Sequence, residues 1–193
     1  VPPGTERRMC LQPGHITLLA GVARTMRTLN LCNHFAEAAG ARALGRALPL
    51  SRSLTELRLD KNGLGDAGAA GLARGLFRNT SLTYLSVADN GIRGAGTAAI
   101  AEALRYSTRT GVVTLRLDGN IVGTAGSEAL NALISAGSKL KRLELSLCGL
   151  TNAQLPGLLD ALVAAKSLSA LDLSANLLSE PSGVMLGEAL PKV

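Results

Sequence analysis

Three glycines, Gly63, Gly65 and Gly68, have the spacing G-x-G-x-x-G. An apolar-alternating run precedes them and an Ala/Leu-rich run of helical period follows, which is the strand, turn and helix arrangement of a dinucleotide-binding fingerprint. Asp89 follows Gly68 by 21 residues, where an acid that binds a ribose hydroxyl is expected. Taken alone, this stretch predicts an oxidoreductase that uses a nicotinamide or flavin dinucleotide.

The two histidines and three cysteines of the chain form no credible catalytic or metal-binding set. His34 follows Cys32 by two residues, but nothing places a third group to orient the imidazole for nucleophilic catalysis. No second Cys/His pair has zinc-ligand spacing, and the acidic residues are dispersed singly. His15, Cys10 and Cys148 are isolated as well. These residues predict no enzyme, no metal and no cofactor, and so few cysteines favour a reducing, intracellular compartment.

The composition of the chain limits the kind of fold that could position such residues. At 193 residues with 47% hydrophobic and 18% charged residues, the chain is one folded domain. Trp is absent and Phe and Tyr number two each, so the core must be aliphatic, which suits small repeated units. No run approaches the ~20 apolar residues of a membrane helix. The first residue is Val, which indicates a removed presequence or a piece of a longer chain.

The net charge of +6 is concentrated near the N-terminus, where residues 1–53 hold seven Lys and Arg against two Asp and Glu. An acidic protein, an anionic surface or nucleic acid could dock there. A solvated arginine-rich face is the simpler interpretation. No motif supports duplex nucleic acid, and one Tyr across six strands is too few for single-stranded RNA, so we expect no nucleic-acid partner.

Internal repeats explain the glycine motif differently. Strand-like runs start at residues 26, 54, 82, 112, 140 and 168, at intervals of 28, 28, 30, 28 and 28. One unit reads Leu54-x-x-Leu57-x-Leu59-x-x-Asn62-x-Leu64-x-x-x-Gly68-x-x-x-Leu72-x-x-x-Leu76, and the next two units match it at every one of these positions. The period changes from that of a strand to that of a helix within each unit.

The Asn after each strand predicts a ladder of side-chain amides that bind backbone groups where the chain turns out of the sheet. Its expected members are Asn62, Asn90, Asn120, Cys148 and Asn176. The glycines at 68, 96 and 126 are predicted to let each helix approach its strand closely. Gly68 is thus a repeat position and Asp89 merely precedes the next Asn, so a dinucleotide-dependent oxidoreductase remains only as a remote alternative.

This pattern resembles the leucine-rich repeats of the ribonuclease-inhibitor type, with units similar to those of NOD-like receptors and Ran GTPase-activating protein. The resemblance covers residues 26–193 and implies an α/β solenoid: a curved right-handed array with a parallel sheet on its inner, concave face and helices outside. Residues 26–193 are then six repeats in one structural domain. Residues 1–25 are an N-terminal cap or half-repeat with a short helix over residues 11–23.

Some units depart from the pattern. His34 stands in the Asn position of the first unit, Cys148 in that of the fifth, and Gln154 and Ser182 replace the glycine of the last two. Irregular end units are expected where a solenoid must be capped. The two extra residues of the third unit fall near residues 107–110.

The remaining candidate site is the concave face, whose side chains alternate with the buried leucines. Its predicted partner-binding residues are Glu56, Arg58, Asp60, Tyr84, Ser86, Arg116, Asp118, Arg142, Glu144 and Asp172. Arg and aromatic residues are the usual anchors of an interface, although such residues also form solvated cross-strand pairs.

We therefore expect a non-enzymatic module that binds a protein partner through this face. The alternative is a structural subunit embedded permanently in a large assembly, with its helical face and its ends in contact with neighbours. A cytoplasmic, cytoskeletal or organellar location fits either hypothesis.

Overall fold

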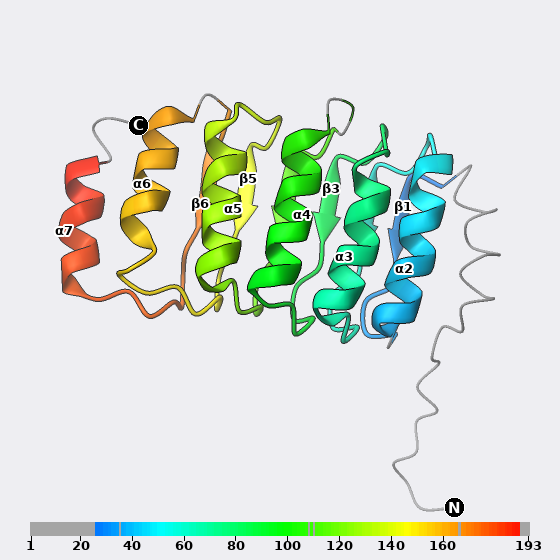
Figure 1. Cartoon of the computed structure of the whole chain (residues 1–193), viewed down its shortest axis with the longest axis horizontal. Helices are drawn as coiled ribbons and strands as arrows, with labels where there is room; N and C mark the ends of the chain where they lie inside the picture. Colours follow the sequence, from blue (N-terminus) through cyan, green and yellow to red (C-terminus); the bar gives the residue numbers. More distant parts are fainter. Residues whose placement is uncertain (1–25, 35, 108, 110, 166, 190–193) are drawn as a thin grey trace, which may run out of the picture.

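Six strand–helix units stand in a row in the computed structural model, which describes residues 26–34, 36–107, 109, 111–165 and 167–189 (Figure 1). The strands are β1 (Thr28–Asn30), β2 (Glu56–Arg58), β3 (Tyr84–Ser86), β4 (Thr114–Arg116), β5 (Arg142–Glu144) and β6 (Ala170–Asp172). The helices are α2 (Glu37–Ala47), α3 (Gly65–Leu76), α4 (Gly94–Tyr106), α5 (Gly123–Ser135), α6 (Leu155–Ala164) and α7 (Glu180–Ala189), with a 3-10 turn, η1 (Leu48–Leu50), after α2. The predicted helix at 11–23 lies outside the described residues.

The sheet is parallel and runs in chain order from β1 to β6. Equivalent repeat positions pair across it: Leu57 is in register with Leu85, and Leu85 with Leu115. Each crossover between neighbouring parallel strands passes through a helix, and the helices lie in one row along one side of the sheet (Figure 1). The predicted α/β solenoid architecture, an unclosed array of strand–helix units, is confirmed.

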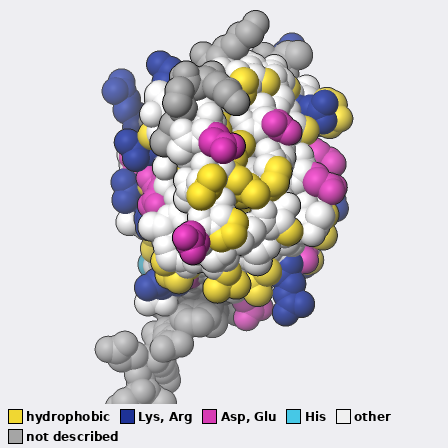
Figure 2. All heavy atoms as spheres, turned by 90° about the vertical axis from the view of Figure 1, so that its left-hand side faces the viewer, with side chains coloured by type: hydrophobic (Ala, Val, Ile, Leu, Met, Phe, Trp, Pro, Cys, Tyr) yellow, Lys and Arg dark blue, Asp and Glu magenta, His cyan; other side chains and the backbone are white. Residues whose placement is uncertain are grey.

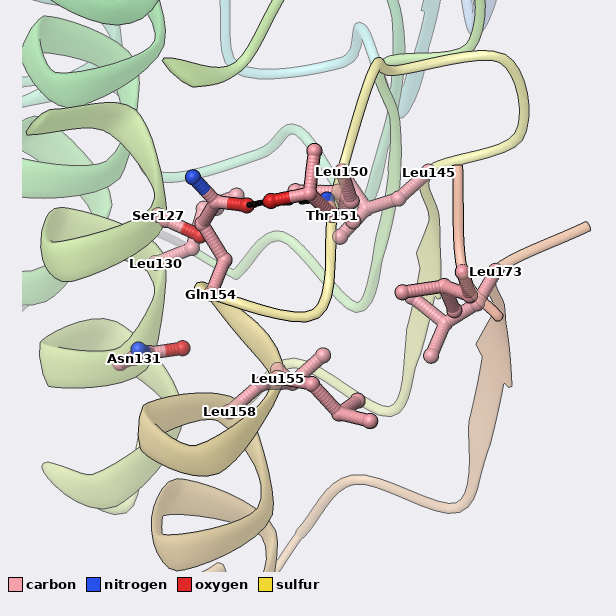
Figure 3. Close-up of a pocket in the computed structure, with 11 residues that line it drawn as sticks. Ser127, Leu130, Asn131, Leu145, Leu150, Thr151, Gln154, Leu155, Leu158 and Leu173 are labelled. Carbon is pink, nitrogen blue, oxygen red and sulfur yellow. Dashed lines mark hydrogen bonds between the residues drawn. The ribbon is translucent and has the colours of Figure 1, made fainter. Parts of the chain in front are cut away.

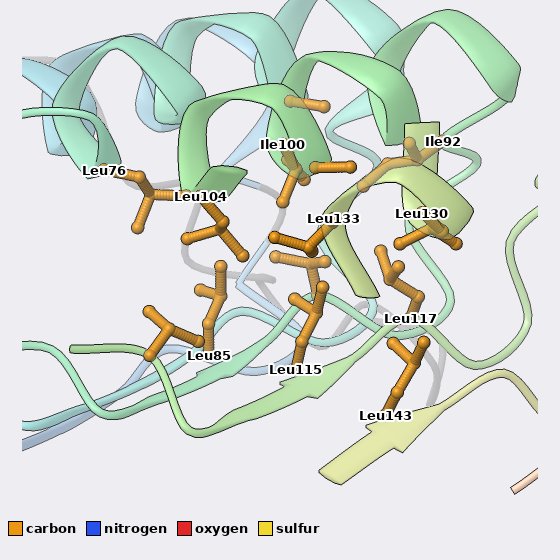
Figure 4. Packing of buried hydrophobic residues seen from close by; sticks show 14 of the residues in the cluster. Leu76, Leu85, Ile92, Ile100, Leu104, Leu115, Leu117, Leu130, Leu133 and Leu143 are labelled. Atoms are coloured by element: carbon orange, nitrogen blue, oxygen red, sulfur yellow. The ribbon is translucent and has the colours of Figure 1, made fainter. Parts of the chain in front are cut away.

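The core lies between the sheet and the row of helices. Leu85 points from β3 toward Leu104 of α4, and Leu115 points from β4 toward Leu133 of α5 (Figure 4). Leu104 is 5% exposed and the other three side chains are 0% exposed. Burial of such a side chain stabilises the fold by roughly 1.5–3 kcal/mol. Aliphatic side chains at equivalent positions of successive units therefore build one continuous core.

Glycines allow close approach, but between consecutive helices rather than between helix and strand as the sequence predicted. A Cβ on Gly126 of α5 would lie 2.9 Å from the Cβ of Thr97 on α4. A Cβ on Gly75 of α3 would lie 2.1 Å from the carbonyl oxygen of Gly45 on α2. Helix backbones thus contact directly, which explains why α2 and α3 pack tightly.

Where the glycine is replaced, hydrogen bonds anchor the start of the helix instead. Gln154, just before α6, accepts hydrogen bonds at Oε1 from the backbone N–H and the hydroxyl of Thr151, at 2.9 and 2.7 Å (Figure 3). The buried Ser182 of α7 donates its hydroxyl to Asn152. Gln154 and Ser182, which replace the glycine of the last two units, are therefore polar residues that form hydrogen bonds within the protein.

The apolar seam in Figure 3, lined by side chains such as Leu130, Leu145 and Leu158, holds a cavity of about 10 Å³. That is room for about one water molecule, so it is a packing defect and not a ligand site.

None of the helices in the described part of the chain is long and apolar enough to cross a membrane.

Candidate functional site

The open face of the sheet is the surface formed by the predicted residues Glu56, Arg58, Asp60, Tyr84, Ser86, Arg116, Asp118, Arg142, Glu144 and Asp172. The leucines that alternate with them in β2 to β5 are buried toward the helices, and those of β6 are partly buried on the same side, so strand geometry directs these side chains to the opposite side. Within the described residues, all helices lie on the other side of the sheet (Figure 1).

Arg116 on β4 is the centre of an ion network on this face. Its Nε lies 2.7 Å from Oδ2 of Asp118 and 2.9 Å from Oε2 of Glu144, and its Nη1 lies 3.8 Å from Oδ2 of Asp60. Burial alone would lower the pKa of Arg116, but the hydrogen bond to Asp118 and the charges of Asp60 and Glu144 outweigh it, so the pKa is raised. The guanidinium is held in one place as a cation.

Small side chains on β3 and just after it let Asp60 reach Arg116 across the sheet. Ser86 donates its hydroxyl to Asp60, and the backbone N–H of Ala88 donates to Oδ1 of Asp60 at 2.9 Å. Asp118 repeats the arrangement by accepting from the N–H of Ser146 at 2.8 Å. Ser86 is itself 0% exposed, so it supports Asp60 and offers no contact surface.

The β2–β3 end of the face carries its aromatic contact. Arg58 Nε lies 2.5 Å from Oε1 of Glu56, and its guanidinium carbon lies 5.1 Å from the ring centroid of Tyr84. The hydrogen bond to Glu56 raises the pKa of Arg58. The Arg58 side chain is nevertheless 43% exposed, so it can still donate to a partner.

The ion pair at the β5–β6 end of the face is longer than those around Arg116 Nε and Arg58 Nε. Arg142 Nη1 lies 3.8 Å from Oε1 of Glu144, and the Arg142 side chain is 56% exposed. Asp172 accepts from the N–H of Ser174 at 2.9 Å, and this backbone hydrogen bond lowers the pKa of Asp172.

The asparagines predicted as a ladder lie beneath one edge of this face. Asn90 Oδ1 accepts from the N–H of Asn62 at 3.0 Å and of Leu64 at 3.4 Å, and its Nδ2 donates to the carbonyls of Leu59 and Ala88, both at 2.9 Å. Asn120 binds the backbone of the unit before it in the same way. In the first unit, where His34 replaces Asn, the His34 N–H still donates to Oδ1 of Asn62.

Cys148 interrupts the ladder. Its Sγ, 3.4 Å from the Leu117 carbonyl, replaces the Asn amide as a donor, but it supplies no amide oxygen. The backbone amide of Asn120 interacts with the thiol in place of an amide oxygen, and the N–H of Val122 donates to the carbonyl of Cys148 at 3.2 Å. Burial raises the pKa of Cys148 to about 12, so this thiol stays protonated and unreactive near neutral pH.

The other chemical candidates are accounted for by packing and backbone contacts. His34 Nδ1 lies 2.7 Å from the carbonyl oxygen of Cys32, so the imidazole contacts the backbone of Cys32 and not its thiol. A Cβ on Gly68 would lie 3.0 Å from Cβ of Leu64 and 3.1 Å from Cα of Ala38, so this glycine serves helix packing. No group of three or more potential metal ligands occurs in the described ranges.

One surface escaped the sequence reasoning. At the C-terminal ends of α2, α3 and α4, exposed arginines gather with Leu50, Phe77 and Tyr106 around an open hollow. A signal was present, because Leu50, Arg78 and Tyr106 are spaced by 28 residues and occupy one repeat position.

The family model described as Leucine Rich repeat matches residues 50–73 and 78–101. Both segments lie in the strand–helix units just described. The matched units are leucine-rich repeats. No curated protein sequence matches the chain.

Solved structures share the fold of this chain at low sequence identity. One is the tropomodulin C-terminal domain of Caenorhabditis elegans, with 13% identity, a TM-score of 0.52, and coverage of 92% of both chains. Another is Leiomodin-1 Actin-Binding Site 2, with 16% identity, a TM-score of 0.55, and coverage of 92% of this chain and 86% of that chain. At these identities the likeness concerns the fold alone.

Proposed function

We propose that this leucine-rich repeat protein is a non-enzymatic interaction module that binds a protein partner through the open face of the sheet. The observation that carries the proposal is the network around Arg116, which fixes charged side chains on a rigid sheet that no described helix covers. Side chains already held in place lose little conformational entropy when a partner docks.

Two arginines are suited to make the contact. Arg58, stacked on Tyr84, and Arg142 are the most exposed cations of the ion pairs on this face, at 43% and 56%. Arg and Tyr are the residue types that most often anchor interfaces. Carboxylates surround them, so we expect a partner surface of mixed charge with acidic groups opposite Arg58 and Arg142.

Actin is the first partner to test. Leiomodin-1 Actin-Binding Site 2 is named for actin binding, and its fold extends over 92% of this chain.

The structural alternative, a subunit of a large assembly, is favoured by a different observation. Leu177 and Val184 in the last unit are 70% and 60% exposed, and apolar surface of this kind is often covered by a neighbour. Both proposals fit an intracellular, reducing compartment.

The test compares two charge reversals of equal size. Arg58→Glu combined with Arg142→Glu alters the open face, whereas Arg93→Glu combined with Arg105→Glu alters exposed positions at the two ends of α4. Circular dichroism first establishes that each variant folds. Purified actin, monomeric and filamentous, and a cell extract at low and high salt are then passed over each immobilised protein.

Loss of about tenfold or more in affinity for a partner with the open-face variant alone supports the proposal. Equal loss with both variants, or loss with the α4 variant alone, contradicts it. Retention of a large particle at high salt by every variant favours the embedded subunit instead.

A further inference from the structure

The second surface lies at the C-terminal ends of α2, α3 and α4, the upper ends of these helices in Figure 1. We call it the basic–aromatic rim and define it by Arg46, Arg78, Arg109, Leu50, Phe77 and Tyr106. These side chains line an open hollow of about 590 Å³. A neighbouring hollow of about 290 Å³ shares Arg46 and Arg78 and adds Arg42 and Arg74.

The charge of the rim is of one sign. Five arginines line the two hollows, and neither hollow is lined by Asp or Glu. All ion pairs of the described residues lie on the open face of the sheet, and none involves these arginines. The arginines of the sheet are thus neutralised within the molecule, whereas those of the rim are not.

Helix packing forces these like charges together. A Cβ on Gly71 would lie 2.5 Å from Cγ of Arg42, so the backbone of α3 lies directly against the Arg42 side chain of α2. Arg42 and Arg46 are four residues apart within α2, where like charges destabilise a helix. Their position near helix C-termini offsets part of that repulsion. An anionic ligand would relieve the rest.

The rim also exposes large apolar side chains. Leu50 is 63%, Phe77 49% and Tyr106 60% exposed, although the chain has only four aromatic residues. Arginine beside exposed aromatic rings is the composition of an interface anchor. A purely solvated basic face would not need Leu50 and Phe77 beside it.

We propose that the basic–aromatic rim binds an acidic protein segment that inserts one large apolar side chain into the hollow. Its carboxylates pair with Arg46, Arg78 and Arg109, and its apolar side chain packs on Leu50 and Phe77. This surface is separate from the open face of the sheet, so the proposal does not depend on that function.

Two features favour a peptide over single-stranded nucleic acid. The exposed Leu50 is aliphatic, so it offers a contact for an apolar side chain but no ring on which a base could stack. The guanidinium of Arg105 lies 4.9 Å from the ring centroid of Tyr106 and already occupies one face of the ring on which a base would stack.

The experiment uses the whole chain and three fluorescent probes at low salt. The first probe is a short polyglutamate peptide with one central Phe, the second has Gly in place of that Phe, and the third is an oligouridylate of equal charge. Binding is measured by anisotropy for the wild type, for Arg46→Glu with Arg78→Glu, for Phe77→Ala, and for the control Arg93→Glu with Lys139→Glu. Both positions of the control are exposed and lie outside the rim.

We expect the Phe peptide to bind about tenfold more tightly than the Gly peptide and than the oligouridylate. The rim double variant should weaken Phe-peptide binding by about tenfold or more, and Phe77→Ala should remove the preference for Phe over Gly. The control should change neither value appreciably.

Equal binding of the two peptides would overturn the proposal, because the rim would then act by charge alone. Tighter binding of the oligouridylate with the same dependence on Arg46 and Arg78 would assign the rim to nucleic acid instead. An equal effect of the control variant would also overturn it.

Discussion

The middle of the array and its last unit carry the same motif but bury it differently. Leu115 and Leu117 in the fourth unit are 0% exposed, whereas Leu171 and Leu173, the same repeat positions in the sixth unit, are only half-buried. Figure 2, a view of the C-terminal end, shows hydrophobic side chains gathered there at the surface. A leucine of this motif is therefore buried by its two neighbouring units as much as by its own helix.

The largest test of this comparison truncates one leucine in each place. Leu115→Ala should lower the free energy of unfolding by about 3–4 kcal/mol, because it leaves a cavity inside a closed core. Leu171→Ala should cost about 1 kcal/mol, since water already reaches part of that side chain. Urea unfolding of both variants measures the two values. Equal losses would mean that the last unit is packed as well as the middle of the array.

The ladder asparagines give a second, smaller contrast. Asn120, 1% exposed, donates to the carbonyls of Val87 and Leu117 and accepts from the N–H of Asn90 and Ile92. Asn120→Ala should cost about 2–3 kcal/mol because several buried backbone groups lose their partner. Asn176 is half-buried, so water can replace its amide, and Asn176→Ala should cost about half as much in the same urea experiment. A larger cost at Asn176 would contradict the contrast.

Cys148 separates the middle from the last unit and should make stability pH-dependent. Its pKa is about 12 in the folded protein and near 9.0 unfolded. Because the unfolded thiol ionises first, the stability conferred by the neutral thiol is complete below about pH 9 and is lost as pH rises toward about 12.

Between about pH 8 and pH 11 the wild type should therefore lose about 2 kcal/mol more stability than Cys148→Ala. Urea unfolding at both pH values measures this difference, in which the contribution of other titrating groups cancels. Parallel losses in the two proteins would show that the thiol is as accessible folded as unfolded.

The smallest expected effect comes from repairing the ladder at this position. Cys148→Asn supplies an amide oxygen for the N–H of Asn120, and this oxygen is a stronger acceptor than the thiol sulfur with which that N–H now interacts. We expect a gain of about 1 kcal/mol, the net value of one buried hydrogen bond. Thermal unfolding of Cys148→Asn beside Cys148→Ala measures it, and a Tm of the Asn variant at or below that of the Ala variant would disprove the repair.

Much of the architecture follows from local regularity. The motif positions of Leu57, Leu85 and Leu115 predicted strands in register, and the structure pairs them. The same regularity identified the open-face residues, because alternation along a strand places them opposite the leucines. It also indicated that Gly68 is a glycine of the repeat and not of a dinucleotide-binding site. In the structure Gly68 packs against Ala38 of α2, which explains why a glycine is needed there.

Other features depend on contacts between residues distant in sequence. The reach of Asp60 past Ser86 to Arg116, the burial of Ser86 and the contact of Gly126 with Thr97 are set by neighbouring units. The basic–aromatic rim is of the same kind, since Arg46, Arg78 and Arg109 come from three units that line one hollow. The backbones of α2 and α3 touch at Gly45 and Gly75, which brings the first two of these units close together.

The repeat pattern of the amino-acid sequence sets the period, and with it the order of strands, the side on which the helices lie and the face that the charges occupy. A periodic pattern needs only local geometry, because each residue's direction follows from its strand or helix position. The tertiary structure alone decided which charges are neutralised. Ion pairing depends on distances of a few ångströms between units, and those distances are set by how closely each unit packs on the next.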